Sequence, residues 1–320
     1  MSNAVPSSGS QAGPSRRPVL SRQLRQDLRA YLFLSPWLVS LLVFTAYPML
    51  ASFYFALTRY NILNPPEFVG LANFDEMLRG DPLFWIAVYN TIYYTLISVP
   101  LGLAVSLGLA ILLNFSVRGI GIYRTIFYLP SLVPVVASTL IWLVLLNPRL
   151  GLVNAGLEAI GLPRPGWLQS ADWSKPGLIL MSLWTGVGGA MLIFLAGLQD
   201  VPQSLVDAAM IDGANGWERF RHITLPLITP TIFFNLIMGI IGSFQVFGQV
   251  LVSGGSGGQV GPLNSLLMYL VLIYRNAFRF FNMGYASALA LVLFLVLVLL
   301  TLLVVRTSNY WVYYEVGARK

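Results

Sequence analysis

The sequence contains six apolar runs, each longer than the ~20 residues that a helix needs to cross the ~30 Å hydrocarbon core of a bilayer. Only 10% of the residues are charged, and the mean hydropathy is +0.74. Soluble domains contain about 25% charged residues. The sequence therefore predicts an all-α, polytopic membrane protein. Its six transmembrane helices are expected at about Tyr31–Leu57, Phe84–Asn114, Ile122–Leu146, Gly177–Leu198, Leu227–Val252 and Phe281–Val305.

The residue inventory argues against several classes of function. Cysteine is absent and histidine occurs once, so we expect no disulfide framework and no metal site. No acid–base pair, D-D or H-x-x-x-D cluster marks a catalytic centre, so we expect no catalytic residues and no enzyme activity. The net charge of +7 fits basic cytoplasmic loops better than nucleic acid binding, because no basic run is interleaved with exposed aromatic residues.

The distribution of lysine and arginine predicts the orientation in the membrane. Six spans place both termini on one side, and that side carries twelve basic residues while the other carries seven. Because cytoplasmic loops are enriched in basic residues, both termini are expected in the cytoplasm. The predicted organisation is a disordered tail (residues 1–29), a six-helix transmembrane domain (30–305) with a cytoplasmic loop (199–226), and a cytoplasmic tail (306–320).

The chain has no evident energy source of its own. No Asp, Glu, Lys, Arg or His lies in the interior of a predicted span, whereas ion-coupled carriers usually keep such groups at mid-membrane. No G-x-x-x-x-G-K-[ST] motif is present either, so the chain cannot bind ATP in a Walker loop. Energy for transport would therefore arrive through a partner. A self-contained carrier remains the alternative, because backbone carbonyls can also bind sodium.

Two clusters of small and uncharged polar residues interrupt the apolar spans. They are Ser182, Thr185, Gly186 and Gly189, and Ser243, Phe244, Gln245 and Gln249, the last one helical turn beyond Gln245. Hydroxyls and amides of this kind can hydrogen-bond a polyol without burying a charge, and an aromatic ring can stack on a sugar. For any single residue, ordinary helix packing is the favoured explanation, because small and polar side chains also join transmembrane helices. For the two clusters together, both interpretations stay open.

A polar stretch with recognisable helix start and stop signals, Asp207–Pro226, separates the fourth and fifth spans. Ser204 is a candidate N-cap, and Asp207 lies in the first turn, where a carboxylate suits the helix dipole. Gly213 can adopt a positive φ and end this helix. The pattern predicts a short helix, a turn and a second helix that returns toward the membrane.

This stretch resembles the cytoplasmic motif of permease subunits of ATP-binding-cassette importers, E-A-A-x3-G-x9-I-x-L-P. The matching residues are Asp207, Ala208, Ala209, Gly213, Ile223, Leu225 and Pro226. Asp207 replaces the usual Glu, which shortens the reach of the carboxylate by one methylene. "FVGLANF", "NT" at Asn90, "LAGLQDVP" and "GYASALA" are similar to the carbohydrate-uptake branch, which contains the maltose and glycerol-3-phosphate systems. The resemblance covers residues 30–305.

The resemblance implies a type I importer permease fold and a multi-pass location in the prokaryotic plasma membrane. It implies a second permease subunit, giving a heterodimer, together with an extracytoplasmic solute-binding protein and two ATPase subunits that hold ATP and Mg. The chain itself would bind no cofactor. The implied substrate is a sugar, with glycerol 3-phosphate as an alternative. The implied ATPase-coupling residues are Asp207, Ala208, Ala209, Asp212, Gly213, Ile223, Leu225 and Pro226.

Overall fold

A computed structural model describes residues 20–115, 117–254 and 259–313, which fall into two compact units with a boundary after Ser52. The first unit contains α1 (Leu20–Ser40), the π-helical turn η1 (Leu41–Ala46) and the start of α2 (Tyr47–Ala56). A candidate membrane span runs from Arg29 to Ala56, as predicted. Apolar side chains such as Leu32 and Phe33 are exposed on it, which suits a helix surrounded by hydrocarbon.

The predicted N-terminal boundary is wrong. A disordered segment was expected through Arg29, but α1 begins at Leu20. Pro and Arg in this stretch suggested a tail, yet "LSRQLRQDLRA" consists almost entirely of residues with good helix propensity. The rest of the predicted tail, residues 1–19, lies outside the described residues.

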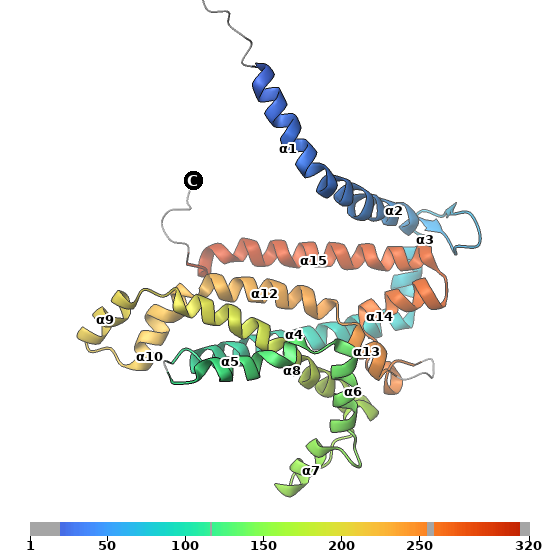
Figure 1. Ribbon diagram of the computed structural model, residues 1–320. Coiled ribbons are helices and arrows are strands. Elements are labelled where there is room, and N and C mark those ends of the chain that lie inside the picture. The colour runs from blue at the N-terminus through green and yellow to red at the C-terminus, as the bar shows by residue number, and fades with distance from the viewer. Residues whose placement is uncertain (1–19, 116, 255–258, 314–320) are drawn as a thin grey trace, which may run out of the picture. The chain divides into compact units, whose positions relative to one another are not determined.

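Long helices that lie side by side build the second unit (Figure 1). They are α4 (Pro82–Leu112), α8 (Ala171–Gln199), α12 (Thr229–Phe244) and α15 (Met283–Trp311). Asp81 caps α4, where its carboxylate accepts a hydrogen bond from the Leu83 N–H at 2.8 Å, and Pro82 follows where no N–H is needed. α12 and α13 (Gly248–Ser253) together form one candidate span.

The third predicted span is broken into two helices. α5 (Ile120–Tyr128) and the 3-10 turn η3 (Leu129–Leu132) are followed by α6 (Val135–Leu145) after a bend of 99°. Pro130 and Pro134 lie at the bend, and each removes a backbone N–H that a continuous helix would use. The described residues therefore hold five helices able to span a bilayer, or six spans if the bent pair is counted as one.

Short elements connect the spans at the end of the bundle where α4 begins (Figure 1). They are β1 (Thr58–Arg59), β2 (Glu67–Phe68), α3 (Ala72–Asp75), η2 (Glu76–Gly80), α7 (Leu152–Ala159), η4 (Trp167–Gln169), η6 (Pro262–Asn264), α14 (Tyr269–Tyr274) and η7 (Arg275–Arg279). The two strands form a minimal antiparallel pair, with Thr58 opposite Phe68. Asn73 secures it, because its Nδ2 donates to the carbonyls of Ala56 and Thr58 at 2.8 and 2.9 Å.

Two apolar clusters form the core of the second unit. The larger joins α4, α6, α8, α14 and α15, and the smaller joins α4, α8 and the start of α12 around Phe194, Leu198 and Ile228. Gly188 lets α5 approach α8 closely, since a Cβ there would lie 2.6 Å from the Phe127 carbonyl oxygen.

The final helix is longer than predicted. It was expected to end near Val305, with a tail from residue 306, but α15 continues to Trp311. Ser308 is buried and Trp311 packs edge-on against Phe233 at 6.1 Å, so tertiary contacts extend this end of the helix. Residues 314–320 of the predicted tail lie outside the described residues, as do residues 255–258 of the glycine-rich segment Ser253–Pro262.

Candidate functional site

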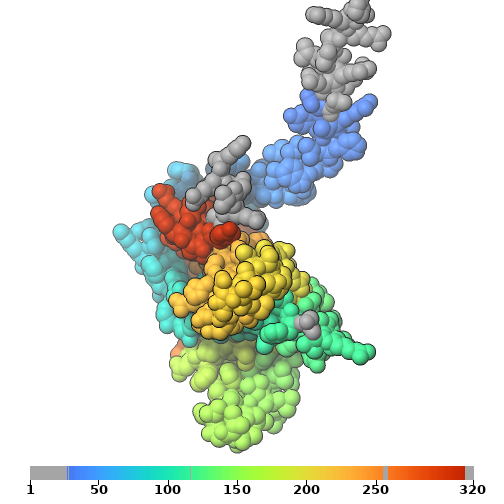
Figure 2. Space-filling model, turned by 90° about the vertical axis from the view of Figure 1, so that its left-hand side faces the viewer, coloured from blue at the N-terminus to red at the C-terminus, as the bar shows by residue number. Residues whose placement is uncertain are grey.

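The polar stretch between α8 and α12 folds into an elbow at one end of the bundle. It consists of α9 (Gln203–Ile211), α10 (Gly216–Arg219), the π turn η5 (Phe220–Thr224) and α11 (Leu225–Leu227). Figure 1 places α9 and α10 beyond the ends of the long helices, and Figure 2 views the molecule from this side, with the elbow (yellow) foremost. The elbow therefore stands clear of the bundle that carries it.

Backbone geometry fixes the turn between the two elbow helices. Gly213 adopts a φ of +83°, a region that L-residues other than glycine rarely enter. The N–H of Gly213 donates to the Met210 carbonyl at 3.1 Å, and the N–H of Ala214 donates to the Ala209 carbonyl at 2.9 Å. This pair of bonds is the Schellman arrangement that ends a helix at a left-handed residue. The predicted role of Gly213 as a helix stop is confirmed.

A capping box begins the second elbow helix. The Glu218 N–H donates to Asn215 Oδ1 at 3.0 Å, and the Asn215 N–H donates to Glu218 Oε2 at 2.8 Å. The expected cap of the first helix is different. Pro202, rather than Ser204, occupies the N-cap position of α9, and Ser204 lies inside the helix and makes no capping bond. Proline at this position fixes φ near −60° and so directs the chain into the first turn.

The residues predicted to couple the chain to an ATPase divide between the exposed tip of the elbow and its half-buried base. Asp207, Ala208, Asp212 and Gly213 are exposed, Ala209 is half-buried, and no residue of α9 is buried. The Asp207 carboxylate accepts a hydrogen bond from Gln203 Nε2 at 2.9 Å. At the base, Ile223, Leu225 and Pro226 are half-buried, and Leu225 packs against the smaller core cluster. Force applied at the tip would therefore reach the core of the bundle.

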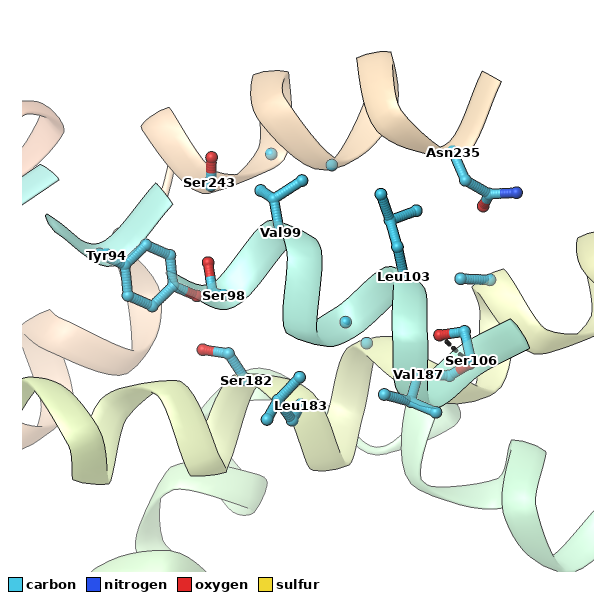
Figure 3. Close-up of a pocket in the computed structure, with 15 residues that line it drawn as sticks. Tyr94, Ser98, Val99, Leu103, Ser106, Ser182, Leu183, Val187, Asn235 and Ser243 are labelled. Carbon is cyan, nitrogen blue, oxygen red and sulfur yellow. Dashed lines mark hydrogen bonds between the residues drawn. The ribbon is translucent and has the colours of Figure 1, made fainter. Parts of the chain in front are cut away.

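A cavity of about 170 Å³ lies between α4, α8 and α12 (Figure 3), and its mostly apolar lining carries a few uncharged polar groups. Serines from all three helices line it, and every side chain in the lining is uncharged. The polar lining residues are Tyr94, Ser98, Ser106, Ser182, Asn235 and Ser243. Ser106 Oγ donates to the Val187 carbonyl at 3.3 Å, which ties α4 to α8 beside the cavity. The combination of apolar surface with a few uncharged hydrogen-bonding groups is compatible with a neutral solute that carries hydroxyl groups.

The structure brings together only part of the two predicted polar clusters. Ser182, Gly186 and Ser243 line the cavity. Gln249 does not line it, but its Oε1 accepts a hydrogen bond from Ser182 Oγ at 2.8 Å, so the two clusters meet. Ser243 Oγ also donates to Thr95 Oγ1 at 2.9 Å, within the buried contact between α12 and α4. These bonds support the packing interpretation as much as the binding one.

The other predicted pathway residues lie away from the cavity. Thr185 donates to carbonyls of its own helix, at 3.4 and 3.2 Å, and Gly189 does not contribute to the lining. Phe244 lines a separate apolar groove. Gln245 is exposed where α12 ends, so it does not lie one helical turn from Gln249 as predicted. The helix is interrupted over residues 245–247, and it resumes at Gly248, where a Cβ would lie 3.0 Å from Val135 Cγ1.

The sequence interpretation missed the contribution of α4 to the cavity. Tyr94, Ser98 and Ser106 come from this helix, and in Figure 3 Tyr94 points toward Ser98. A signal was present, because Tyr94, Ser98, Gly102 and Ser106 recur every four residues and so share one helical face. Asn235 of α12 carried the same signal, because Asn235, Gly239 and Ser243 also recur every four residues and all three line the cavity.

Comparison with known proteins agrees with this architecture. Residues 98–309 match the family described as "Binding-protein-dependent transport system inner membrane component". The probable ABC transporter permease protein YesP of Bacillus subtilis is 42% identical over 299 residues, which cover 92% of this chain and 95% of that protein. The lactose transport system permease protein LacF of Rhizobium radiobacter is 34% identical over 300 residues, which cover 92% and 96%.

A solved structure shares the fold. A chain of a bacterial ABC transporter involved in the import of the acidic polysaccharide alginate superposes with a TM-score of 0.78 at 24% identity, covering 91% of this chain and 98% of that one. The type I importer permease fold expected from the sequence is thereby confirmed. The family match contains the elbow and the helices that flank it. This chain belongs to the family of binding-protein-dependent transport system inner membrane components.

Proposed function

We propose that this chain is one of two permease subunits that together line the pathway of an ATP-binding-cassette importer for saccharides. The elbow is the observation that carries the proposal. Its motif, Asp207 to Pro226, folds as an exposed helix and turn at the end of a membrane bundle, inside the region that matches the family. An exposed, rigid element of this kind is suited to transmit force from a separate subunit.

Two ATPase subunits are the proposed source of that force. Ala208 and Ala209 give the elbow a small-residue surface over which a groove could close, and the neighbouring Leu205 and Ile211 expose apolar side chains. Exposed apolar side chains that gather on one element indicate a candidate protein interaction site. ATP and Mg would bind to the ATPase subunits, and this chain would contribute no catalytic residue and bind no cofactor.

The size and lining of the cavity support both the substrate class and the second permease. Ligand pockets usually measure about 300–1,000 Å³, so a cavity of about 170 Å³ provides only part of a site. A partner permease, different from this chain, would supply the remainder across the pathway. The lining is mostly apolar with a few hydroxyl groups and no charged side chain, which suits a mono- or oligosaccharide better than glycerol 3-phosphate, for which a cation would be expected. The relative named as a lactose permease supports the same class.

The proposed orientation places the elbow and both termini in the cytoplasm, as the distribution of basic residues indicates. The opposite end of the bundle, with α3, α7 and α14, would then face the extracytoplasmic binding protein that delivers the saccharide (Figure 1). The membrane domain would comprise residues 30–305, extended at both ends by the helices described above.

Reconstitution into liposomes tests the proposed function. The chain, its partner permease, the ATPase subunits and a saccharide-loaded binding protein are combined, and each component is omitted in turn. ATP-driven uptake is expected only with the complete set. Accumulation by this chain alone, driven by an ion gradient, would support a self-contained carrier instead. Uptake of glycerol 3-phosphate in preference to every saccharide tested would contradict the proposed substrate class.

A further inference from the structure

An ammonium group lies near the start of α8, at the end of the bundle opposite the elbow (Figure 1). Lys175 Nζ lies 3.3 Å from Asn90 Oδ1, and 5.6 and 5.4 Å from the ring centroids of Tyr89 and Tyr93. The two tyrosines are one turn apart on α4, with ring centroids separated by 6.3 Å. Lys175 is half-buried, whereas Tyr89 is 61% exposed. The cation is therefore held beside an aromatic surface that is open to its surroundings.

No carboxylate within 4.0 Å neutralises this cation. In the described part of the chain the salt bridges join Arg79 to Asp75 and Arg164 to Glu158. Asp172, in the first turn of α8, acts on Lys175 only at longer range. The ring faces and the amide oxygen supply partial negative charge, but the ammonium has three N–H donors and retains capacity for an anion.

The exposed flank of α4 continues from this cation into an apolar groove. Tyr89, Tyr93, Leu96 and Pro100 follow one another at spacings of four, three and four residues, and so form one stripe on the helix. Leu96 and Pro100 line a groove of about 560 Å³ between α4, α12 and α15, whose accessible surface is entirely apolar. The tyrosines beside the Lys175 ammonium and the residues at the edge of the apolar groove thus lie on the same face of α4.

We propose that this face binds a phospholipid, with the phosphate at Lys175 and one acyl chain along the stripe into the groove. A hydrophilic solute would meet no polar group beyond the tyrosines, because Ile97 and Leu101 on the adjoining face are also apolar and exposed. Tyrosine and lysine at the end of a membrane span are typical of the level of lipid headgroups. If the elbow is cytoplasmic, as proposed, the lipid belongs to the outer leaflet.

Lipid retention by the full chain tests this inference. The protein is reconstituted in nanodiscs of phosphatidylcholine and phosphatidylglycerol, and lipids that stay bound after transfer to detergent are identified by native mass spectrometry. Lys175→Gln is expected to lower retained phosphatidylglycerol about fivefold, the effect of about 1 kcal/mol from one basic residue near a lipid surface. Lys175→Arg is expected to retain it, because the charge remains.

Two further variants make the result specific. Arg149→Gln removes an exposed cation from the loop before α7 and is expected to leave retention unchanged. Leu96→Trp fills the groove at an exposed position and is expected to lower retention of both lipids. Wild-type retention in Lys175→Gln, or an equal loss in Arg149→Gln, would overturn the proposal. So would binding of diglucuronate that disappears in Lys175→Gln while lipid retention stays unchanged, which would assign the cation to an acidic solute.

Discussion

At the residue scale, single residues determine the conformation of a turn and the contact between two helices. Gly213 has a positive φ, and no atom within 4 Å would obstruct a Cβ there. Its role is therefore conformational and not a matter of space. Thr95 and Ser243 carry a different role, since their hydroxyls form a buried hydrogen bond between α4 and α12. Such hydrogen bonds stabilise the packing of helices inside a membrane, where water does not replace them.

Replacing Gly213 tests the conformational role. Gly213→Ala is expected to strain the turn by about 1–2 kcal/mol, because an L-side chain disfavours left-handed backbone. In the reconstituted importer, the ATP hydrolysed per saccharide transported should rise several-fold while the complex still assembles. Gly108→Ala is the matched control, since this glycine has equal free space without the positive φ. Normal coupling in Gly213→Ala would show that the turn does not transmit force.

A double-mutant cycle tests the contact between Thr95 and Ser243. Thr95→Val, Ser243→Ala and the double variant are compared by thermal unfolding in detergent. A coupling energy of about 0.6 kcal/mol, and at most about 1.7, is expected for a hydrogen bond between transmembrane helices. Additive losses, with no coupling energy, would mean that the two hydroxyls act independently.

Residue roles were predictable where a local backbone rule determines them, and less so where a role depends on tertiary neighbours. Gly213 follows from its position after a helix-forming stretch. The sequence could not predict that Gln245 and Gln249 lie on different helices, because no residue pattern in "GSFQVFGQV" indicates that the helix is interrupted. The contact of Ser182 with Gln249 depends on how α8 and α13 pack, which spacing along either helix does not encode.

At the element scale, the elbow contains two capped helix termini, and each cap is formed by local residues. The Schellman turn ends α9, and the capping box of Asn215 and Glu218 begins α10. The bend between α5 and α6 follows from similar local chemistry, because Pro130 and Pro134 remove two N–H donors. The backbone conformation of these turns is determined by their own sequence more than by tertiary contacts. The angle between the helices that each turn connects is therefore restricted.

Hydrogen exchange tests the capping box. Asn215→Ala is expected to speed exchange of the Glu218 and Arg219 amides about fivefold, corresponding to the ~1 kcal/mol of a lost N-cap. Asn215→Asp keeps an acceptor and should exchange as wild type. Ser204→Ala is the second control, because Ser204 makes no capping bond and its loss should leave exchange unchanged. Faster exchange across α9 in Ser204→Ala would contradict this assignment of the caps.

The spans themselves were the most predictable elements. The helices α4, α8 and α15, the span formed by α12 and α13, and the candidate span at Arg29–Ala56 occur within several residues of their predicted positions. Long apolar runs leave a chain few alternatives in lipid. The prediction of the third span as one continuous helix was wrong, because hydropathy does not reveal that Pro130 and Pro134 break the helix. The predicted helix boundaries were wrong at both ends of the chain. α1 begins at Leu20 and α15 ends at Trp311, because helix propensity and packing extend these helices beyond their apolar segments.

At the scale of the whole molecule, continuous helices of the second unit join the elbow, the proposed ATPase-binding end, to the cavity between α4, α8 and α12. The base of the elbow packs into the cluster around Phe194 and Ile228, and α8 and α12 lead from that cluster to Ser182 and Ser243 at the cavity. Movement of the elbow would therefore be transmitted along rigid helices and alter the helix contacts that enclose the cavity. In the proposed importer, the second permease would supply the rest of the substrate site at this small cavity.

The central claim is that an ATPase partner grips the elbow on the cytoplasmic side. The chain contains no cysteine, so Ala208→Cys introduces its single thiol. Maleimide labelling of this thiol is measured in sealed right-side-out and inside-out vesicles, with and without the ATPase subunits. We predict labelling by an impermeant maleimide only in inside-out vesicles, and protection once the ATPase subunits are bound. Labelling from the outer side, or an unchanged rate in an ATP-hydrolysing complex, would contradict the account.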